Sequence, residues 1–250
     1  MPYSICVYVI ECNYYAIMRF ETDTLTDMDL QDLIKEFSIF SPLSENEIFR
    51  LTSNSRIKIF KKNRYVFRPG DDCHYLYFLI DGTIKVGCSS TDGREVIKTI
   101  LHPRALFGEE SLFGHEVFND FAKVISSEVT LLVIRVDEFR NLMATNIDLN
   151  FNIFNLIGKK LKKTENRLES LIFNDARTRI INFIKENAKN FGRQVGFEML
   201  LKHSLTQQDI ANYTGTSRQT VTSVLNDLKK SNQIYFKRKS ILIRDMATLS

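Results

Sequence analysis

Between Arg56 and Val136, apolar residues recur at every second position, in short runs separated by residues that favour turns. Such alternation is typical of β-strands with one buried and one solvated face. The runs cover residues 57–59, 65–67, 75–80, 83–86, 95–100, 122–125 and 129–136, and a short helical turn at 107–114 interrupts them. Many short strands joined by turns such as Asp81-Gly82 and Thr91-Asp92-Gly93 predict an all-β roll or barrel.

Helical periodicity precedes this all-β segment. A helix is predicted to begin near Met28, with an apolar face made of Leu30, Leu33, Ile34 and Phe37. Ser44 followed by Glu47 is typical of the capping box that starts a second short helix. Residues 1–27 have no clear period, and we expect them to be a weakly ordered extension, with the natural start at Met18 or Met28.

A long helix is predicted after the all-β segment, from about Asp148 to Phe173, and a helix of that length spans about 40 Å. Its apolar stripe is Leu149, Ile153, Leu156, Ile157, Leu161, Leu168, Leu171 and Ile172. The helix can pack on its own barrel or pair with a second copy of itself. The near-heptad spacing favours pairing, so we expect a homodimer joined through residues 148–173.

Residues 206–230 predict two short helices joined by a tight turn at Gly215. Thr216 or Ser217 is the expected N-cap of the second helix, whose inward positions are Val221, Val224, Leu225 and Leu228. Ser217, Arg218, Gln219, Thr220 and Ser223 remain on its outward face. Arg can bind guanine, Gln can bind adenine, and hydroxyl and free N–H groups can bind phosphates, so this face favours the major groove of DNA over an ordinary helical hairpin.

Two further strands close the chain around a basic tip, which completes the pattern of a winged helix-turn-helix. The residues expected to contact double-stranded DNA are Thr206, Gln207, Ser217, Arg218, Gln219, Thr220, Ser223, Lys237, Arg238 and Lys239. Charge supports this interpretation, since residues 175–250 hold 13 Lys and Arg against 6 Asp and Glu, a net +7, whereas the whole chain carries only +4.

Composition excludes several classes of protein. Apolar and charged fractions of 44% and 26% are those of a globular protein, and no apolar run reaches the length of a membrane helix. The cysteines, Cys6, Cys12, Cys73 and Cys88, form no C-x-x-C pair, so we expect free thiols in the cytoplasm and no iron–sulfur cluster. Metal-ligand spacing, a nucleophile elbow and a phosphate loop are missing, which argues against an enzyme.

The order of these segments resembles the Crp/Fnr family of bacterial transcription regulators, from about Met28 to Ala247. The matching residues are Pro69-Gly70-Asp71, residues 77–86, Asp92-Gly93-Arg94-Glu95, Phe107-Gly108-Glu109, Asp175 with Arg179, and residues 215–221. The resemblance implies an α+β fold: an N-terminal double-stranded β-helix (a β-roll of the cyclic-nucleotide-binding type), a long dimerisation helix and a C-terminal winged helix-turn-helix. The implied bounds are 28–145, 146–174 and 175–250, after the extension at 1–27.

The same resemblance implies a homodimer on a near-palindromic operator, with RNA polymerase as a partner if the protein activates transcription. Arg218 matches the family's guanine-reading arginine. Gln219 replaces a frequent Glu and Ser223 replaces an Arg of several members, so we expect an operator that differs from that of the cyclic-AMP-responsive members.

The resemblance places an effector pocket at Gly108, Glu109, Glu110, Asn119, Asp120, Phe121, Ala122, Thr164 and Glu165. In members that bind cyclic AMP, an Arg-Ser-Ala follows the Gly-Glu pair and holds the phosphate. The segment at 119–122 offers no cation, and Asp120 would repel a phosphodiester, so the sequence argues against cyclic AMP.

Several alternatives for the sensor stay open beside this prediction. His74, His102 and His115 offer nitrogen ligands for haem, and Cys73 or Cys88 a thiol switch, although no neighbouring pattern supports either. A cyclic-nucleotide-binding module that serves another protein is the third, and the absence of a kinase or a membrane pore argues against it. A small apolar or acidic effector, or none, is equally compatible with the sequence.

Overall fold

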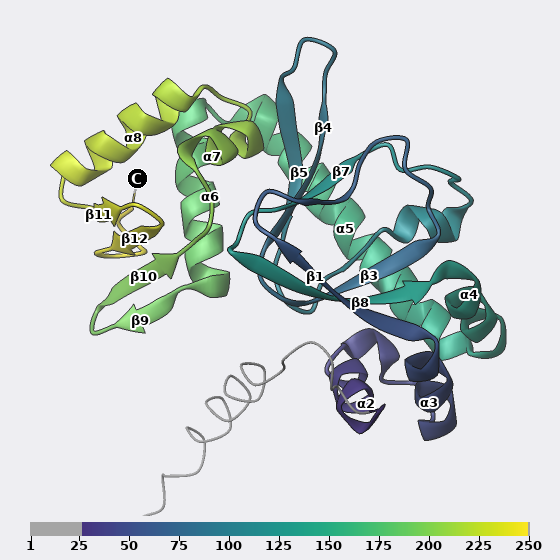
Figure 1. Ribbon diagram of the computed structural model, residues 1–250. Coiled ribbons are helices and arrows are strands. Elements are labelled where there is room, and N and C mark those ends of the chain that lie inside the picture. The colour runs from purple at the N-terminus through teal and green to yellow at the C-terminus, as the bar shows by residue number, and fades with distance from the viewer. Residues whose placement is uncertain (1–26, 250) are drawn as a thin grey trace, which may run out of the picture.

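The computed structural model describes residues 27–249, so the expected extension, apart from Asp27, and the thiols of Cys6 and Cys12 lie outside the described part. Figure 1 shows three parts in chain order: a β-roll with short helices around it, one long helix, and a smaller mixed domain that lies beside the roll. No helix of the described chain is long and apolar enough to cross a membrane.

Short helices precede the roll as predicted. They are α2 (Asp27–Lys35), the 3₁₀ helix η1 (Ser38–Phe40) and α3 (Glu45–Ser53). The capping box of α3 is confirmed, because Ser44 Oγ accepts from the Glu47 amide at 3.4 Å and the Glu47 carboxylate accepts from the Ser44 amide at 2.8 Å. Ile34, Phe40 and Leu51 of these helices are buried against the roll.

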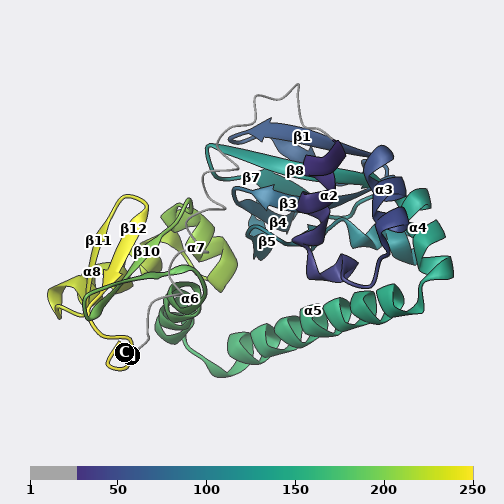
Figure 2. The same ribbon diagram turned by 90° about the horizontal axis from the view of Figure 1, so that it is seen from below.

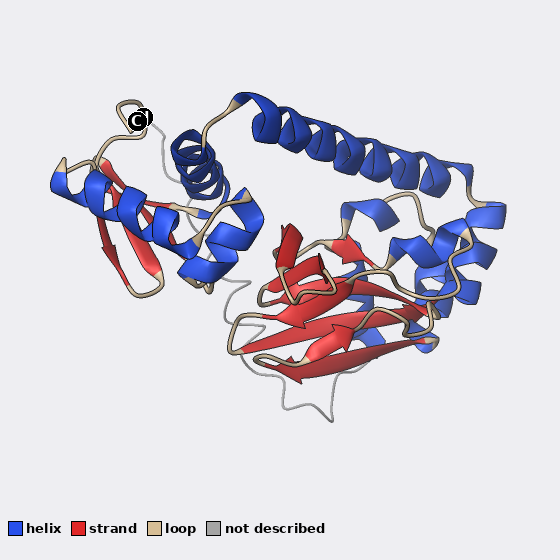
Figure 3. Ribbon diagram, turned by 90° about the horizontal axis from the view of Figure 1, so that it is seen from above, coloured by secondary structure: helices blue, strands red, loops and turns tan. Residues whose placement is uncertain are grey.

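Two antiparallel four-stranded sheets form the roll, as the period-two pattern predicts. The first has the order β1 (Ser55–Lys61), β8 (Glu128–Arg135), β3 (Tyr75–Asp81), β6 (Leu106–Phe107), and the second β2 (Tyr65–Phe67), β7 (Phe121–Val124), β4 (Ile84–Ser89), β5 (Glu95–Leu101). The predicted helical turn is the 3₁₀ helix η2 (Glu109–Phe113). Figure 3 shows these strands gathered on one side of α5, with Figure 2 giving the opposite view.

Aromatic side chains fill the interior of the roll. Phe67 and Phe118 stack with ring centroids 3.7 Å apart, and Tyr77 and Phe107 stack at 5.2 Å. All four belong to one buried cluster with Leu79 and other apolar residues of both sheets. The two sheets are therefore held together by a packed core.

Helix α4 (Val136–Thr145) leads into α5 (Ile147–Phe173), which runs along one side of the roll (Figures 2 and 3). The predicted single stripe of α5 is wrong, because its apolar residues lie on two faces. Leu149 and Ile153 are buried, and Leu156 and Ile157 partly buried, against α5's own domain. The exposed face is Ile147, Phe151, Phe154, Leu161, Leu168 and Ile172, and we call these residues the α5 stripe.

The C-terminal domain contains α6 (Ala176–Phe191), α7 (Gln207–Thr214), α8 (Arg218–Lys230) and a sheet of order β11 (Ile234–Lys237), β12 (Ser240–Ile243), β10 (Glu198–Lys202), β9 (Arg193–Val195). The helices and the closing strands were predicted, but the β9–β10 hairpin was not. All of β9 is exposed, so it shows no apolar alternation from which a strand could be inferred.

Candidate nucleic-acid interface

The turn between α7 and α8 is fixed from three sides. Gly215 has a φ of 64°, and a Cβ there would lie 3.0 Å from Leu171 Cδ2 of α5, so glycine suits both the conformation and the space. The Arg179 guanidinium of α6 donates to the carbonyl oxygens of Thr214, at 2.8 Å, and Gly215, at 3.1 Å. These contacts hold α8 at a set angle to α7.

Helix α8 presents the outward face that the sequence predicted. Ser217 is its N-cap, accepting from the Thr220 amide at 3.0 Å. Ser217, Arg218, Gln219 and Ser223 are exposed and Thr220 is half-buried, whereas Val221, Val224, Leu225 and Leu228 are buried. The exposed first turn thus offers one cation, amide and hydroxyl groups and the positive end of a helix dipole to a ligand.

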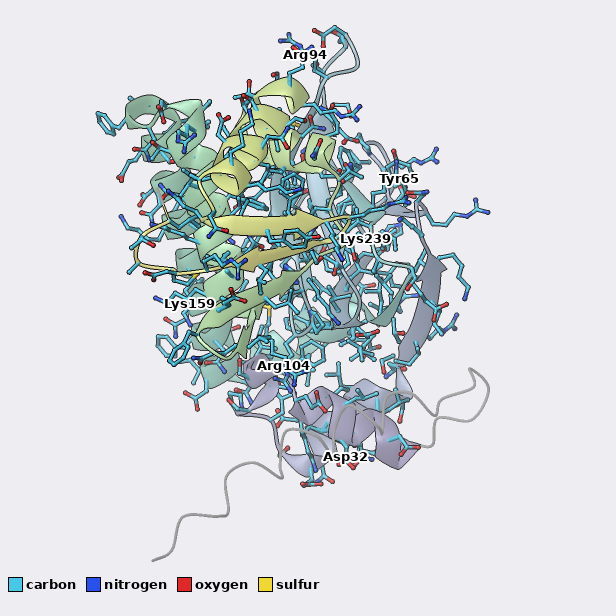
Figure 4. All side chains as sticks on the ribbon, turned by 90° about the vertical axis from the view of Figure 1, so that its left-hand side faces the viewer. Asp32, Tyr65, Arg94, Arg104, Lys159 and Lys239 are labelled. Atoms are coloured by element: carbon cyan, nitrogen blue, oxygen red, sulfur yellow. The ribbon has the colours of Figure 1, made fainter. Side chains whose placement is uncertain are left out.

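A cavity of about 650 Å³ separates α7, α8 and the wing, which is the β11–β12 hairpin. Of the predicted contact residues, Thr206, Gln207, Arg218, Lys237, Arg238 and Lys239 line it, and Ser217, Gln219, Thr220 and Ser223 lie on α8 outside its lining. The structure therefore brings the N-terminal end of α7, the start of α8 and the wing tip around one basic hollow. Figure 4 labels Lys239 at the wing.

The roll also reaches this cavity, which the sequence did not predict. Lys62, in the turn between β1 and β2, lines the hollow together with His203 and Ser204. Lys62 is 177 positions before Lys239, so only the folded arrangement relates them. The hollow gathers positive charge from both ends of the chain, which suits a polyanion.

The predicted effector pocket is occupied by the protein's own ion pairs. Lys160 Nζ of α5 donates to Glu109 Oε1 at 2.5 Å and to the Leu106 carbonyl at 3.0 Å. Lys98 Nζ of β5 lies 2.7 Å from Asp120 Oδ1. Residues 119–122 offer no cation, as the sequence indicates, but two lysines reach the carboxylates from β5 and α5, which the local motif does not include.

The other residues assigned to that pocket have varied surroundings. Phe121 lies on the outer face of its sheet, 6.0 Å from the Tyr65 ring, whereas its neighbour Ala122 faces the interior. Thr164 Oγ1 donates to the Lys160 carbonyl within α5, and Glu165 is exposed beside Lys162. Burial raises the pKa of Glu110, and the nearby Asp120 and Glu109 carboxylates add to this effect.

The groups considered for haem or a thiol switch are dispersed. Burial raises the pKa of the Cys73 thiol to about 11, with Glu110 and Asp72 contributing, which disfavours a reactive thiolate. His102 stacks on Phe191 at 3.6 Å, and His74 is exposed. Within residues 27–249, no three His, Cys, Asp or Glu side chains are placed to hold a metal ion.

Comparison with known proteins agrees with the two-domain arrangement. The family model of the cyclic nucleotide-binding domain matches residues 57–146, and that of the Crp-like helix-turn-helix domain matches residues 178–250. A CRP-like cAMP-activated global transcriptional regulator of Mycobacterium tuberculosis is 31% identical over 221 residues, which are 88% of this chain and 98% of that protein.

Solved structures share the fold at lower identity. FixK2 from Bradyrhizobium japonicum superposes with a TM-score of 0.70 at 18% identity, over 78% of this chain and 95% of that one. The c-di-GMP responsive regulator CLP of Xanthomonas campestris gives 0.68 at 21% identity, over 80% and 99%. Fold, domain matches and sequence identity together establish that the chain belongs to the Crp/Fnr family of DNA-binding transcription regulators.

Proposed function

We propose that the protein acts as a cytoplasmic homodimer that places α8 of each subunit in one half of a near-palindromic operator. The observation that carries the proposal is the exposed first turn of α8, with Arg218 and Gln219 beside the basic hollow and no carboxylate from Thr216 to Ser223. Arg218 would bind a guanine and Gln219 an adenine, while Thr206 and the wing tip would contact phosphates. RNA polymerase is a further partner if the protein activates transcription.

Dimerisation is assigned to the α5 stripe. Its members recur at spacings that alternate between three and four residues, with Gly158 and Glu165 completing the heptad positions. Leu161, Leu168 and Ile172 are each about 60% exposed in the single chain. Such a row of solvent-exposed apolar side chains is typical of a protein–protein interface. A second copy of α5 would cover them and double the DNA-reading surface.

The proposal includes a sensor domain that does not bind cyclic AMP. In family members that bind cyclic AMP, the Glu that matches Glu109 binds the ribose hydroxyl, whereas here Lys160 holds the Glu109 carboxylate. Asp120, which pairs with Lys98, stands where the phosphate-binding arginine of those members would be. The mycobacterial relative is named for activation by cAMP, and the CLP structure is described as c-di-GMP responsive. An effector of other chemistry, or none, fits the residues of this roll better.

Selection of bound sites from random DNA tests the function. The wild-type protein is expected to enrich a two-fold symmetric sequence, and its affinity should fall as salt rises because phosphate contacts release counterions. Arg218→Ala should lose about 1–3 kcal/mol of discrimination at one G·C pair of each half-site. Arg135→Ala, an exposed arginine of the roll, is the matched control and should bind like wild type. Equal affinity of Arg218→Ala for matched and mismatched sites would contradict the assignment.

A further inference from the structure

The DNA-binding domain packs on the outer face of the second sheet of the roll. Helix α7 contacts β5, and Ile125, which follows β7, is buried within the core of the C-terminal domain. Arg167 of α5 reinforces the contact, donating to the Lys98 carbonyl of β5 at 2.6 Å and to the Tyr213 carbonyl of α7 at 2.7 Å. The position of α7 therefore depends on the sensor domain.

A buried cluster of charges lies at the centre of this interface. Lys85 of β4 is the only buried lysine of residues 29–249, with 7% of its surface exposed. Its Nζ donates to Glu95 Oε2 of β5 at 2.6 Å and to Asp209 Oδ1 of α7 at 2.9 Å. Asn212 of α7 donates to the same Glu95 oxygen at 3.3 Å. One cation from the roll thus meets one carboxylate from each domain.

Asp209 has two roles in this arrangement. Its Oδ2 accepts from the Thr206 amide at 2.9 Å and from Thr206 Oγ1 at 2.7 Å, which closes the capping box of α7. Its Oδ1 receives Lys85. Asp209 is 7% exposed and the Glu95 side chain is 23% exposed. Removal of Lys85 would therefore leave a buried and a partly buried carboxylate side by side without their shared counter-charge, which should weaken the docked state relative to a hydrated, separated one.

The same contact reaches the recognition helix. Gln207, two residues before Asp209, accepts from Thr222 Oγ1 of α8 at 2.8 Å. In the docked arrangement the outward face of α8 remains exposed, and Lys62 of the roll stands at the DNA-facing hollow with Gln207 and Arg218. Docking therefore leaves the reading surface free and adds positive charge to it.

We propose that Lys85 is a positioning residue for DNA recognition: a cation of the sensor domain that fixes α7 and α8 through the Asp209 carboxylate, so that DNA affinity depends on this ion cluster. The proposal rests on the DNA-binding function given above. In this proposal, the docked domain arrangement is the form that binds DNA.

Operator affinity and amide hydrogen exchange, measured on Lys85→Met and wild type, test the proposal. The probe is the duplex that the wild-type protein selects from random DNA. Lys85→Met should bind it at least about tenfold more weakly, with an unchanged base preference, because the reading residues are intact. Without DNA, exchange at residues 206–214 should be faster in Lys85→Met, which reports docking even if the DNA-binding function itself is wrong.

Two variants separate positioning from a general loss of fold. Lys85→Arg keeps the cation and should restore most of the affinity. Lys123→Met removes a lysine that lies opposite Lys85 on the same face of the same sheet, outside the cluster, and should leave affinity and exchange unchanged. An affinity of Lys85→Met that equals that of Lys123→Met would overturn the proposal. Tighter binding would overturn it too, since the docked form would then be the one that does not bind DNA.

Discussion

Lys160 and Glu109 illustrate how single residues set what the sensor domain can accept. The ion pair joins α5 to the start of η2 across 51 positions of sequence, and its members are 37% and 19% exposed. A ligand hydroxyl that needed Glu109 would have to displace a charged donor, at a cost of about 1.5–3 kcal/mol for a hydrogen bond to a charged group.

Isothermal calorimetry with cyclic AMP should therefore give no saturable heat for this protein. The mycobacterial relative, named as a cAMP-activated regulator, is the positive control under the same buffer. Substitution Lys160→Ala frees the Glu109 carboxylate but leaves Asp120 in place, so it should not create a site either. Micromolar binding of cyclic AMP by wild type would refute the assignment of the pocket.

The helices and strands that depend on local sequence alone were well predicted. The caps of α3 and α8 follow from Ser44 and Ser217, and the strands follow from period-two alternation. The predicted apolar stripe of the long helix merged residues of two faces, because periodicity alone does not separate apolar residues that face the roll, such as Leu149 and Ile153, from exposed ones such as Leu161. Lys85 with Asp209, and Lys62 with the wing, are long-range pairs that no local pattern encodes.

At the scale of a single element, the assignment of dimerisation to α5 can be tested by substitution. Leu161→Glu places a charge in the α5 stripe of both subunits and removes two apolar side chains from the expected contact. The dimer dissociation constant should rise at least about a hundredfold, given about 1.5–3 kcal/mol for each buried leucine. Sedimentation velocity measures the change.

Lys159→Glu is the control for that experiment. Lys159 (labelled in Figure 4) lies on α5 away from the stripe and lines a pocket together with Ser38 and Ser41. It introduces the same Glu side chain, with a larger change of net charge than in Leu161→Glu, and should leave the dimer intact. A dimer that survives Leu161→Glu but dissociates with Lys159→Glu would assign the subunit contact to the other face of α5.

At the scale of the whole molecule, contacts between the sensor and DNA-binding domains include a partly buried histidine, so we expect docking of the two domains to depend on pH. His102, between β5 and β6, stacks on Phe191 at the end of α6. Burial lowers the pKa of His102 to about 4, and the positive charge of Lys163 contributes. The imidazole is therefore neutral in the docked molecule at neutral pH.

The sign of the pH effect follows from that depressed pKa. Above the ordinary histidine pKa of about 6.5 both the docked and the released imidazole are neutral, so the contact is at full strength. Between about pH 6.5 and pH 4 only the released imidazole binds a proton. The free energy of docking should therefore weaken by at most about 1.4 kcal/mol per pH unit, and by less than this limit because His102 is partly exposed.

The substitution His102→Phe keeps a ring on Phe191 but cannot titrate. Urea unfolding at pH 7.5 and pH 5 should show a stability loss in wild type that is smaller in His102→Phe, while His74→Phe, at an exposed histidine, should behave as wild type. An identical loss in wild type and His102→Phe would assign the acid sensitivity to other groups and leave the His102 contact without a role in it.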